Sequence, residues 1–133
     1  MQKPRLTSPP IGQRAREVWL GHAAGFSLAH DIREYARARI DPALSSEARA
    51  AALQSIDHAF FGVMEVLDQY PDPLENDRYQ VTLETRIVLW ERQGGDWVEI
   101  LSPEPEGWCM GYHYWLEGDF GDDPPVAGPT DAP

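Results

Sequence analysis

Residues 46–70, SEARAAALQSIDHAFFGVMEVLDQY, carry the pattern around which the rest of the chain is expected to pack. Apolar residues recur in steps of three and four, as they do along one face of a helix: Leu53, Ile56, Phe60, Val63 and Leu67. From Ala59 to Leu67 this predicted helix is apolar on almost every side. Neighbours must cover such a helix from more than one direction. We therefore expect it to lie between a sheet and a second helix.

The second helix is predicted upstream, over residues 13–40. It ends before Pro42, because the residue that precedes a proline avoids the α region. Gly21 and Gly25 share one face of this helix. The pair is compatible either with close approach of another helix or with a kink. Residues 1–12 contain three prolines and are predicted to be a flexible arm.

Downstream of Arg78 the apolar period changes to two, which is typical of strands that bury one face. Strands are predicted over residues 79–90, 97–101 and 108–116. Glycines within residues 93–96 favour a hairpin turn between the first two strands. The simplest arrangement is a three-stranded antiparallel meander with the two N-terminal helices packed on one face. Its class is α+β.

A chain of 133 residues is expected to form a single domain, which we place at residues 13–120. Residues 121–133 are acidic and proline-rich, and they are predicted to be a disordered tail. No apolar run approaches the ~20 residues that span a bilayer, and no signal-like apolar segment follows the basic N-terminus. We expect a cytoplasmic protein without membrane association, and the single cysteine, Cys109, fits a reducing compartment.

Charge is distributed unevenly along the sequence. Residues 1–50 hold eight Lys or Arg and five Asp or Glu, whereas residues 51–133 hold three and seventeen, which together give the net charge of −11. The acidic part repels the phosphate backbone, so a nucleic-acid partner is not expected. It would instead attract a basic protein and speed the encounter. The alternative is that the charge only confers solubility.

Aromatic residues gather in the predicted sheet. A sheet with helices on one face leaves the other face open, and alternation places Trp90 and either Trp108 or Trp115 on that open face. Aromatic anchors within a polar rim are typical of interface hot spots. The alternative is that a terminal segment or a second subunit covers them. The predicted partner-binding residues are Trp90, Trp115, Glu117, Asp119 and Phe120.

A metal site is a competing interpretation of residues 113–123, HYWLEGDFGDD, where a histidine is followed by four carboxylates. Oxygen-rich clusters of this kind can hold Ca²⁺ or Mg²⁺. The candidate ligands are His113, Glu117 and Asp119. Their spacing is not that of an EF-hand loop, and on a regular strand His113 and Glu117 would lie about 13 Å apart. A solvated acidic strand end is therefore favoured over a metal site.

Other candidates for chemistry are weaker. His30 and His58 lie beside aspartates on the two predicted helices, but neither helix has the Glu-x-x-His pattern of bundle metal sites. On a strand, Cys109 would lie about 13 Å from His113, beyond hydrogen-bond reach for a nucleophile and its base. Gly-x-Ser-x-Gly, phosphate-loop and Cys-x-x-Cys motifs are absent from the sequence. These observations do not favour an enzyme.

Two of the arginines, Arg33 and Arg37, share a face of the first predicted helix. They could contact phosphate, but pairing with the acidic part of the same chain, or of a second copy, is the simpler interpretation. The sequence thus favours a small acidic cytosolic binding protein, most concretely an inhibitor- or immunity-type partner of a basic protein. A metal-dependent enzyme with a His/carboxylate site is the alternative. No cofactor is predicted, and a homodimer through the sheet face or the Gly21/Gly25 face is a third interpretation.

Overall fold

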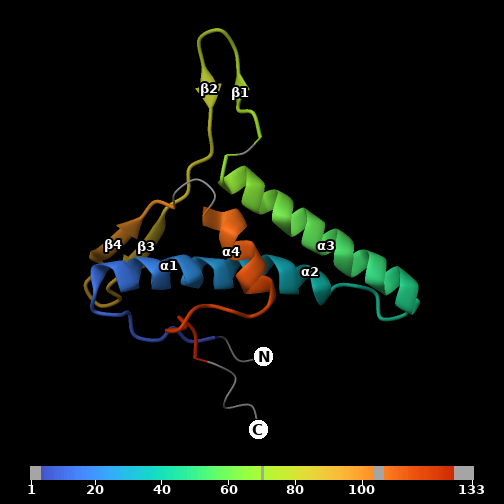
Figure 1. Ribbon diagram of the computed structural model, residues 1–133, viewed down its shortest axis with the longest axis horizontal. Coiled ribbons are helices and arrows are strands. Elements are labelled where there is room, and N and C mark those ends of the chain that lie inside the picture. Colours follow the sequence, from blue (N-terminus) through green and yellow to red (C-terminus); the bar gives the residue numbers. More distant parts are fainter. Residues whose placement is uncertain (1–3, 70, 104–106, 128–133) are drawn as a thin grey trace.

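The computed structural model describes residues 4–69, 71–103 and 107–127. In chain order its elements are α1 (Gln13–Leu28), the π-helical η1 (Ala29–Glu34), α2 (Tyr35–Arg37), α3 (Ser46–Leu67), β1 (Leu74–Glu75), β2 (Gln80–Val81), β3 (Ile87–Trp90), β4 (Trp97–Leu101) and α4 (Gly107–Leu116). The strands form two antiparallel hairpins, β1–β2 and β3–β4. The α+β class is confirmed, and Figure 1 shows the helices gathered beside the β3–β4 hairpin.

Helix α3 is the long helix predicted from its apolar stripe. It begins after Ser45, whose hydroxyl accepts a hydrogen bond of 3.1 Å from the N–H of Ala48. Phe60 and Met64 are fully buried in the core. The elements that pack most against α3 are α4, η1 and α2. The expectation of a sheet on one side of this helix is therefore wrong, because a third helix takes that place.

Residues 107–116 form α4, so the predicted third strand, and with it the three-stranded meander, is wrong. The segment GWCMGYHYWL fits both an alternating and a helical period. Its buried residues are Trp108, Tyr112 and Trp115. Their spacing of four and three is that of a helix face. This face completes the core by packing against α3.

Helix α1 runs without a break through Gly21 and Gly25. The interpretation as a site of close approach is confirmed at Gly25, where an added Cβ would lie 2.1 Å from Cε2 of Trp115. An added Cβ at Gly111 of α4 would lie 2.3 Å from Cζ2 of the same indole. The Trp115 ring therefore fits against α1 and its own helix only because both positions lack a side chain.

The β3–β4 hairpin packs against α1. Leu89 pairs with Glu99 across the two strands, and the register shifts between Leu89 and Trp90. The carboxylate of Glu99 accepts a hydrogen bond from the guanidinium of Arg16 on α1. The predicted packing of two N-terminal helices on one sheet face thus holds for α1, whereas α3 packs on other helices. The prediction of one strand over residues 79–90 is also wrong, since residues 82–86 separate β2 from β3 and the two strands belong to different hairpins.

The described ends of the chain meet beside α1 (Figure 1). Leu6 and Val126 form an isolated antiparallel bridge, and Pro125 is fully buried. The predicted mobility of residues 1–12 and 121–133 stays a prediction, and both ranges extend beyond the described residues. The described residues of the two ranges nevertheless contact each other through this bridge. None of the helices in the described residues combines the length and the hydropathy of a membrane span.

Candidate protein-binding surface

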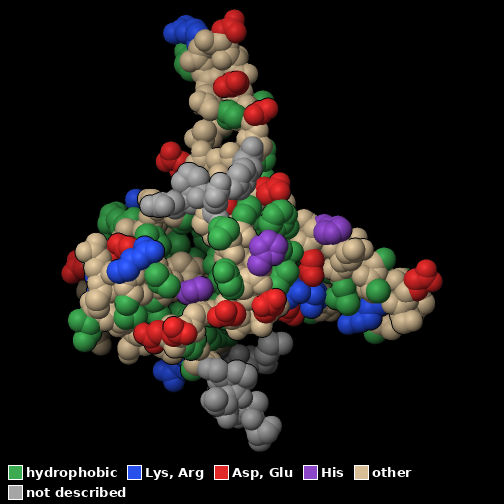
Figure 2. Space-filling model, in the orientation of Figure 1, with side chains coloured by type: hydrophobic (Ala, Val, Ile, Leu, Met, Phe, Trp, Pro, Cys, Tyr) green, Lys and Arg blue, Asp and Glu red, His purple; other side chains and the backbone are tan. Residues whose placement is uncertain are grey.

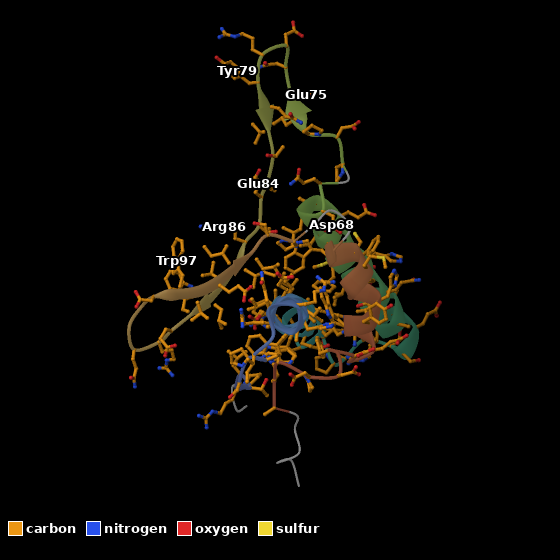
Figure 3. The ribbon with its side chains drawn as sticks, turned by 60° about the vertical axis from the view of Figure 1, so that its left-hand side comes forward. Asp68, Glu75, Tyr79, Glu84, Arg86 and Trp97 are labelled. Carbon is orange, nitrogen blue, oxygen red and sulfur yellow. The ribbon has the colours of Figure 1, made fainter. Side chains whose placement is uncertain are left out.

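Residues 71–84, called the projection below, extend beyond the end of α3 and away from the helices (Figures 1 and 3). They contain β1 and β2, which pair through Leu74 with Val81 and Glu75 with Gln80. The turn is held by Asn76, whose side-chain oxygen accepts the N–H groups of the second and third residues after it at 2.9 and 2.8 Å. Among the described residues, no third strand pairs with either edge of this hairpin.

Apolar side chains on the projection stand in water. Those of Leu74, Tyr79, Val81 and Leu83 are between 60 and 80% exposed. With Val66 and Pro71, three of these residues line a groove of about 450 Å³ at the base of the hairpin. A contiguous exposed apolar surface is a mark of an interaction site in a monomeric protein. An isolated two-stranded hairpin is also only marginally stable in water, so a contact that covered it would add to its stability.

Carboxylates surround these apolar groups. The projection holds four acidic residues, Asp72, Glu75, Asp77 and Glu84, and one basic residue, Arg78. All five are exposed, and the guanidinium of Arg78 lies 5.2 Å from the ring centre of Tyr79. Figure 2 shows acidic side chains from the base of the projection to its tip. The local field is therefore negative over an apolar surface.

A second exposed aromatic surface lies on the β3–β4 hairpin. Trp90 and Trp97 pair across the strands with their rings edge to face, 5.4 Å between centroids, and both are about half exposed. Arg86 lies 5.9 Å from the ring centre of Trp97, and Figure 3 shows Trp97 on the outer side of the hairpin. Trp90 thus lies on an open sheet face, where alternation places it. Its aromatic partner, however, is Trp97.

Trp115 and Trp108 are both in the core, so the expectation that one of them lies on the open face is wrong. Trp115 is only 6% exposed, and its indole N–H donates to Nδ1 of His22 at 3.0 Å. The cause is the helical conformation of α4, which turns both indoles toward the other helices. A strand would have placed them on alternating sides of a sheet.

The acidic residues of the predicted surface follow α4. Glu117 and Asp119 are exposed, whereas Phe120 is partly buried with its ring edge to face against Phe26 of α1, 5.4 Å between centroids. The structure therefore divides the five predicted partner-binding residues. Trp90 lies on the β3–β4 hairpin, and the two carboxylates lie beyond the C-terminal end of α4.

The histidines proposed as metal ligands have other surroundings. His113 is exposed on α4, with its ring 6.1 Å from that of Phe61. His30 stacks on Phe26 at 5.6 Å, and His58 is exposed on α3. Among residues 4–69, 71–103 and 107–127, no three His, Cys, Asp or Glu side chains are grouped so that they could hold a metal ion.

Arg33 and Arg37 both form ion pairs with Asp57 of the same chain. Two nitrogens of Arg33 donate to the Asp57 carboxylate at 2.7 and 3.2 Å, and Arg37 donates to it at 3.3 Å. The hydrogen bonds from Arg33 hold the pKa of Asp57 below its usual value, and burial opposes this effect. The predicted pairing with the acidic part of the chain is confirmed for these two arginines. They join η1 and α2 to α3.

Sequence reasoning missed the projection, because it predicted residues 79–84 only as the start of a long strand. The available signal was the pair of apolar residues Leu74 and Val81, with the turn-forming residue Asn76 between them. Comparison of the chain with protein-family models, with curated proteins and with solved structures found no match. A function for this chain must therefore be argued from the chemistry of the projection and of the Trp90/Trp97 surface.

Proposed function

We propose that this chain is a small acidic binding protein, most concretely an inhibitor- or immunity-type partner of a basic protein. The observation that carries the proposal is the projection, where exposed apolar side chains, open strand edges and four carboxylates coincide. A partner that brings apolar groups together with Lys and Arg would cover all three features. The Trp90/Trp97 pair on the β3–β4 hairpin provides a second exposed aromatic anchor.

Charge favours a basic protein over a second copy of this chain. Two copies would each bring a net charge of −11, and like charges repel during the encounter. A basic surface would instead be steered toward the projection, and steering of this kind raises association rates by about 10- to 1,000-fold. The proposed partner is therefore cationic at its contact surface.

Apolar contact would supply the affinity that charge alone does not. Full burial of a Val, Leu, Ile or Phe side chain contributes about 1.5–3 kcal/mol, and the projection exposes several side chains of similar size. An extended segment of the partner could also pair with an open edge of β1 or β2, which is the mode of recognition called strand addition. Acidic residues would then select the segment, while apolar residues hold it.

The test uses two matched sets of charge-neutralising substitutions in the full chain. One set changes the projection: Asp72→Asn, Glu75→Gln, Asp77→Asn and Glu84→Gln. The control set removes as many charges beyond α4: Glu117→Gln, Asp119→Asn, Asp122→Asn and Asp123→Asn. Proteins retained by the immobilised wild-type chain are identified by mass spectrometry, and the affinity of each purified basic protein is measured by calorimetry.

We expect the projection set to weaken binding by about tenfold or more and the control set to weaken it by about threefold or less. Wild-type affinity should also fall steeply between about 50 mM and about 500 mM salt, because salt screens exposed charges. Equal losses in the two sets would reduce the proposal to nonspecific charge attraction. A loss confined to the control set would favour the Glu117/Asp119 surface, and affinity insensitive to salt would contradict steering by charge.

A further inference from the structure

We propose that the groove between α1, α4 and the end of β4 is a binding site for a neutral, mostly apolar small molecule. This groove is separate from the projection and measures about 520 Å³. Small-molecule sites in proteins typically occupy about 300–1,000 Å³, with apolar walls and a few convergent polar groups. The groove has the size and the composition of such a site.

Its walls are mainly apolar. Ile87, Leu101, Trp108 and Trp115 contribute from the interior of the fold. At the mouth, the side chains of Val18 and Met110 are partly or largely exposed on α1 and α4. A ligand that entered between the two helices would therefore remove apolar surface from water on both sides.

The polar groups around the groove explain why the ligand is uncharged. The indole N–H of Trp108 donates to Thr85 at 3.3 Å, and that of Trp115 donates to His22 at 3.0 Å. At the rim, Arg14 forms an ion pair with Glu17 at 3.5 Å. Each charge on the lining is thus balanced by its neighbour. An ionic ligand would lose hydration here without gaining an unpaired partner.

Two hydroxyl-bearing side chains are available to orient an uncharged polar group. Ser102 and Tyr114 line the mouth of the groove, and both are exposed. A carbonyl, ether or hydroxyl on an otherwise apolar molecule could accept from one of them or donate to it. The ligand class is therefore a neutral, largely apolar molecule with at most one or two such groups.

Gly21 keeps the α1 wall of the groove open. It lines the groove from α1, and an added Cβ there would meet no atom within 4 Å. Packing does not require glycine at this position, in contrast to Gly25. A glycine inside a helix costs about 1 kcal/mol relative to alanine. The absence of a side chain at Gly21 leaves this part of the groove open.

The experiment titrates the full chain with N-phenyl-1-naphthylamine, a neutral apolar dye that fluoresces when it leaves water. Gly21→Leu should fill the groove from its α1 wall. Gly62→Leu is the matched control, because Gly62 is also a helical glycine with open space at its Cβ but lies on α3, outside the groove lining. Circular dichroism and thermal melts establish that each variant is folded.

We expect saturable binding of about one dye per chain, a loss of affinity of about tenfold or more in Gly21→Leu, and little change in Gly62→Leu. The sulfonated dye 1-anilinonaphthalene-8-sulfonate, which has the same rings and a negative charge, should bind more weakly. Met110→Glu, at an exposed position of the rim, should also weaken binding of the neutral dye. If Gly21→Leu does not fold, Met110→Glu tests whether the dye binds in this groove.

Three results would overturn the proposal. The first is that the neutral dye does not bind the wild-type chain. The second is equal binding to Gly21→Leu and Gly62→Leu, or, where the first does not fold, unchanged binding to Met110→Glu. The third is loss of binding in Leu74→Ser with retention in Gly21→Leu, which would assign the dye to the groove on the projection. Because the partner-binding assay does not use this dye, failure of either proposal leaves the other to be judged on its own measurement.

Discussion

The imidazole of His22 joins three parts of the molecule. Its Nδ1 accepts the indole N–H of Trp115 at 3.0 Å, so the neutral ring carries its proton on Nε2. The Nε2 edge faces Gly121, where an added Cβ would lie 3.0 Å from that nitrogen. Burial lowers the pKa of His22, and the nearby carboxylate of Asp119 opposes this shift. One ring thus connects α1, α4 and the segment that follows α4.

This shift predicts a pH-dependent stability. Because the folded pKa of His22 lies below its ordinary value of 6.5, the unfolded chain takes up the proton more readily. The stability that His22 contributes is fully present above pH ~6.5 and is lost as the pH falls from there toward the folded pKa. Protonation also removes the acceptor for the Trp115 indole.

We expect the free energy of unfolding to decrease from about pH 7.5 to about pH 5, and to decrease less in His22→Asn, which keeps an acceptor near Nδ1 but does not titrate. Urea denaturation followed by tryptophan fluorescence at several pH values measures both curves. Parallel curves for the two proteins would contradict the assignment of this dependence to His22.

At the scale of elements, Asp68 links the end of α3 to the beginning of α4. Its carboxylate is buried and accepts the backbone N–H groups of Trp108 and Cys109 at 3.0 and 2.7 Å. The first N–H groups of a helix lack intrahelical acceptors, and a negative charge near them is favourable. A residue 40 positions upstream therefore caps α4. This contact holds the third helix of the core in place.

Asp68→Ala should lower the free energy of unfolding by about 2 kcal/mol or more, because a cap is lost and two backbone donors, one buried and one partly buried, lose their acceptor. Asp72→Ala is the control, since Asp72 is an exposed aspartate four residues further on, and we expect a change within about 0.5 kcal/mol. Chemical denaturation of both variants gives the comparison. A loss in Asp68→Ala as small as that of the control would show that the helix does not depend on this cap.

The two ends of the described chain lie together beside α1 (Figure 1). The N–H of Thr7 donates to the carbonyl of Pro125 at 2.8 Å, and its hydroxyl donates to the carbonyl of Pro124 at 2.8 Å. The same hydroxyl accepts the indole N–H of buried Trp19 at 3.2 Å, and the N–H of Ala127 donates to Arg5 at 3.2 Å. Segments more than 115 residues apart thus share one hydrogen-bond network.

A chain that ends at Asp123 should therefore be less stable than one that ends at Ala127, by about 2–4 kcal/mol. Three hydrogen bonds between the ends contribute about 0.5–1.5 kcal/mol each, and removal of buried Pro125 exposes its contacts. Thermal and urea unfolding of the two truncated chains measure the difference. Identical midpoints would mean that closure of the ends contributes nothing to stability.

Local signals in the sequence were sufficient to predict the first two helical segments and the β3–β4 hairpin. A period of three to four residues, a proline shortly after each helical segment and glycines at the hairpin turn act over a few neighbouring residues, so they do not depend on the rest of the fold. The exposure of Trp90 followed from strand alternation. Helix spacing and charge placed Arg33 and Arg37 on one face and predicted an acidic partner, and the structure shows that this partner is Asp57 of the same chain.

Residues 107–116 were ambiguous, because large apolar side chains at nearly every position satisfy both a strand and a helix. Distant groups resolve the ambiguity: Asp68 accepts the first N–H groups of the helix, and Gly25 makes room for Trp115. The exposure of the projection likewise depends on the tertiary structure, because it results from the other segments packing elsewhere. Contacts between residues far apart in the chain are set by packing, and neither hydrophobic period nor charge encodes which distant group will fill a given space.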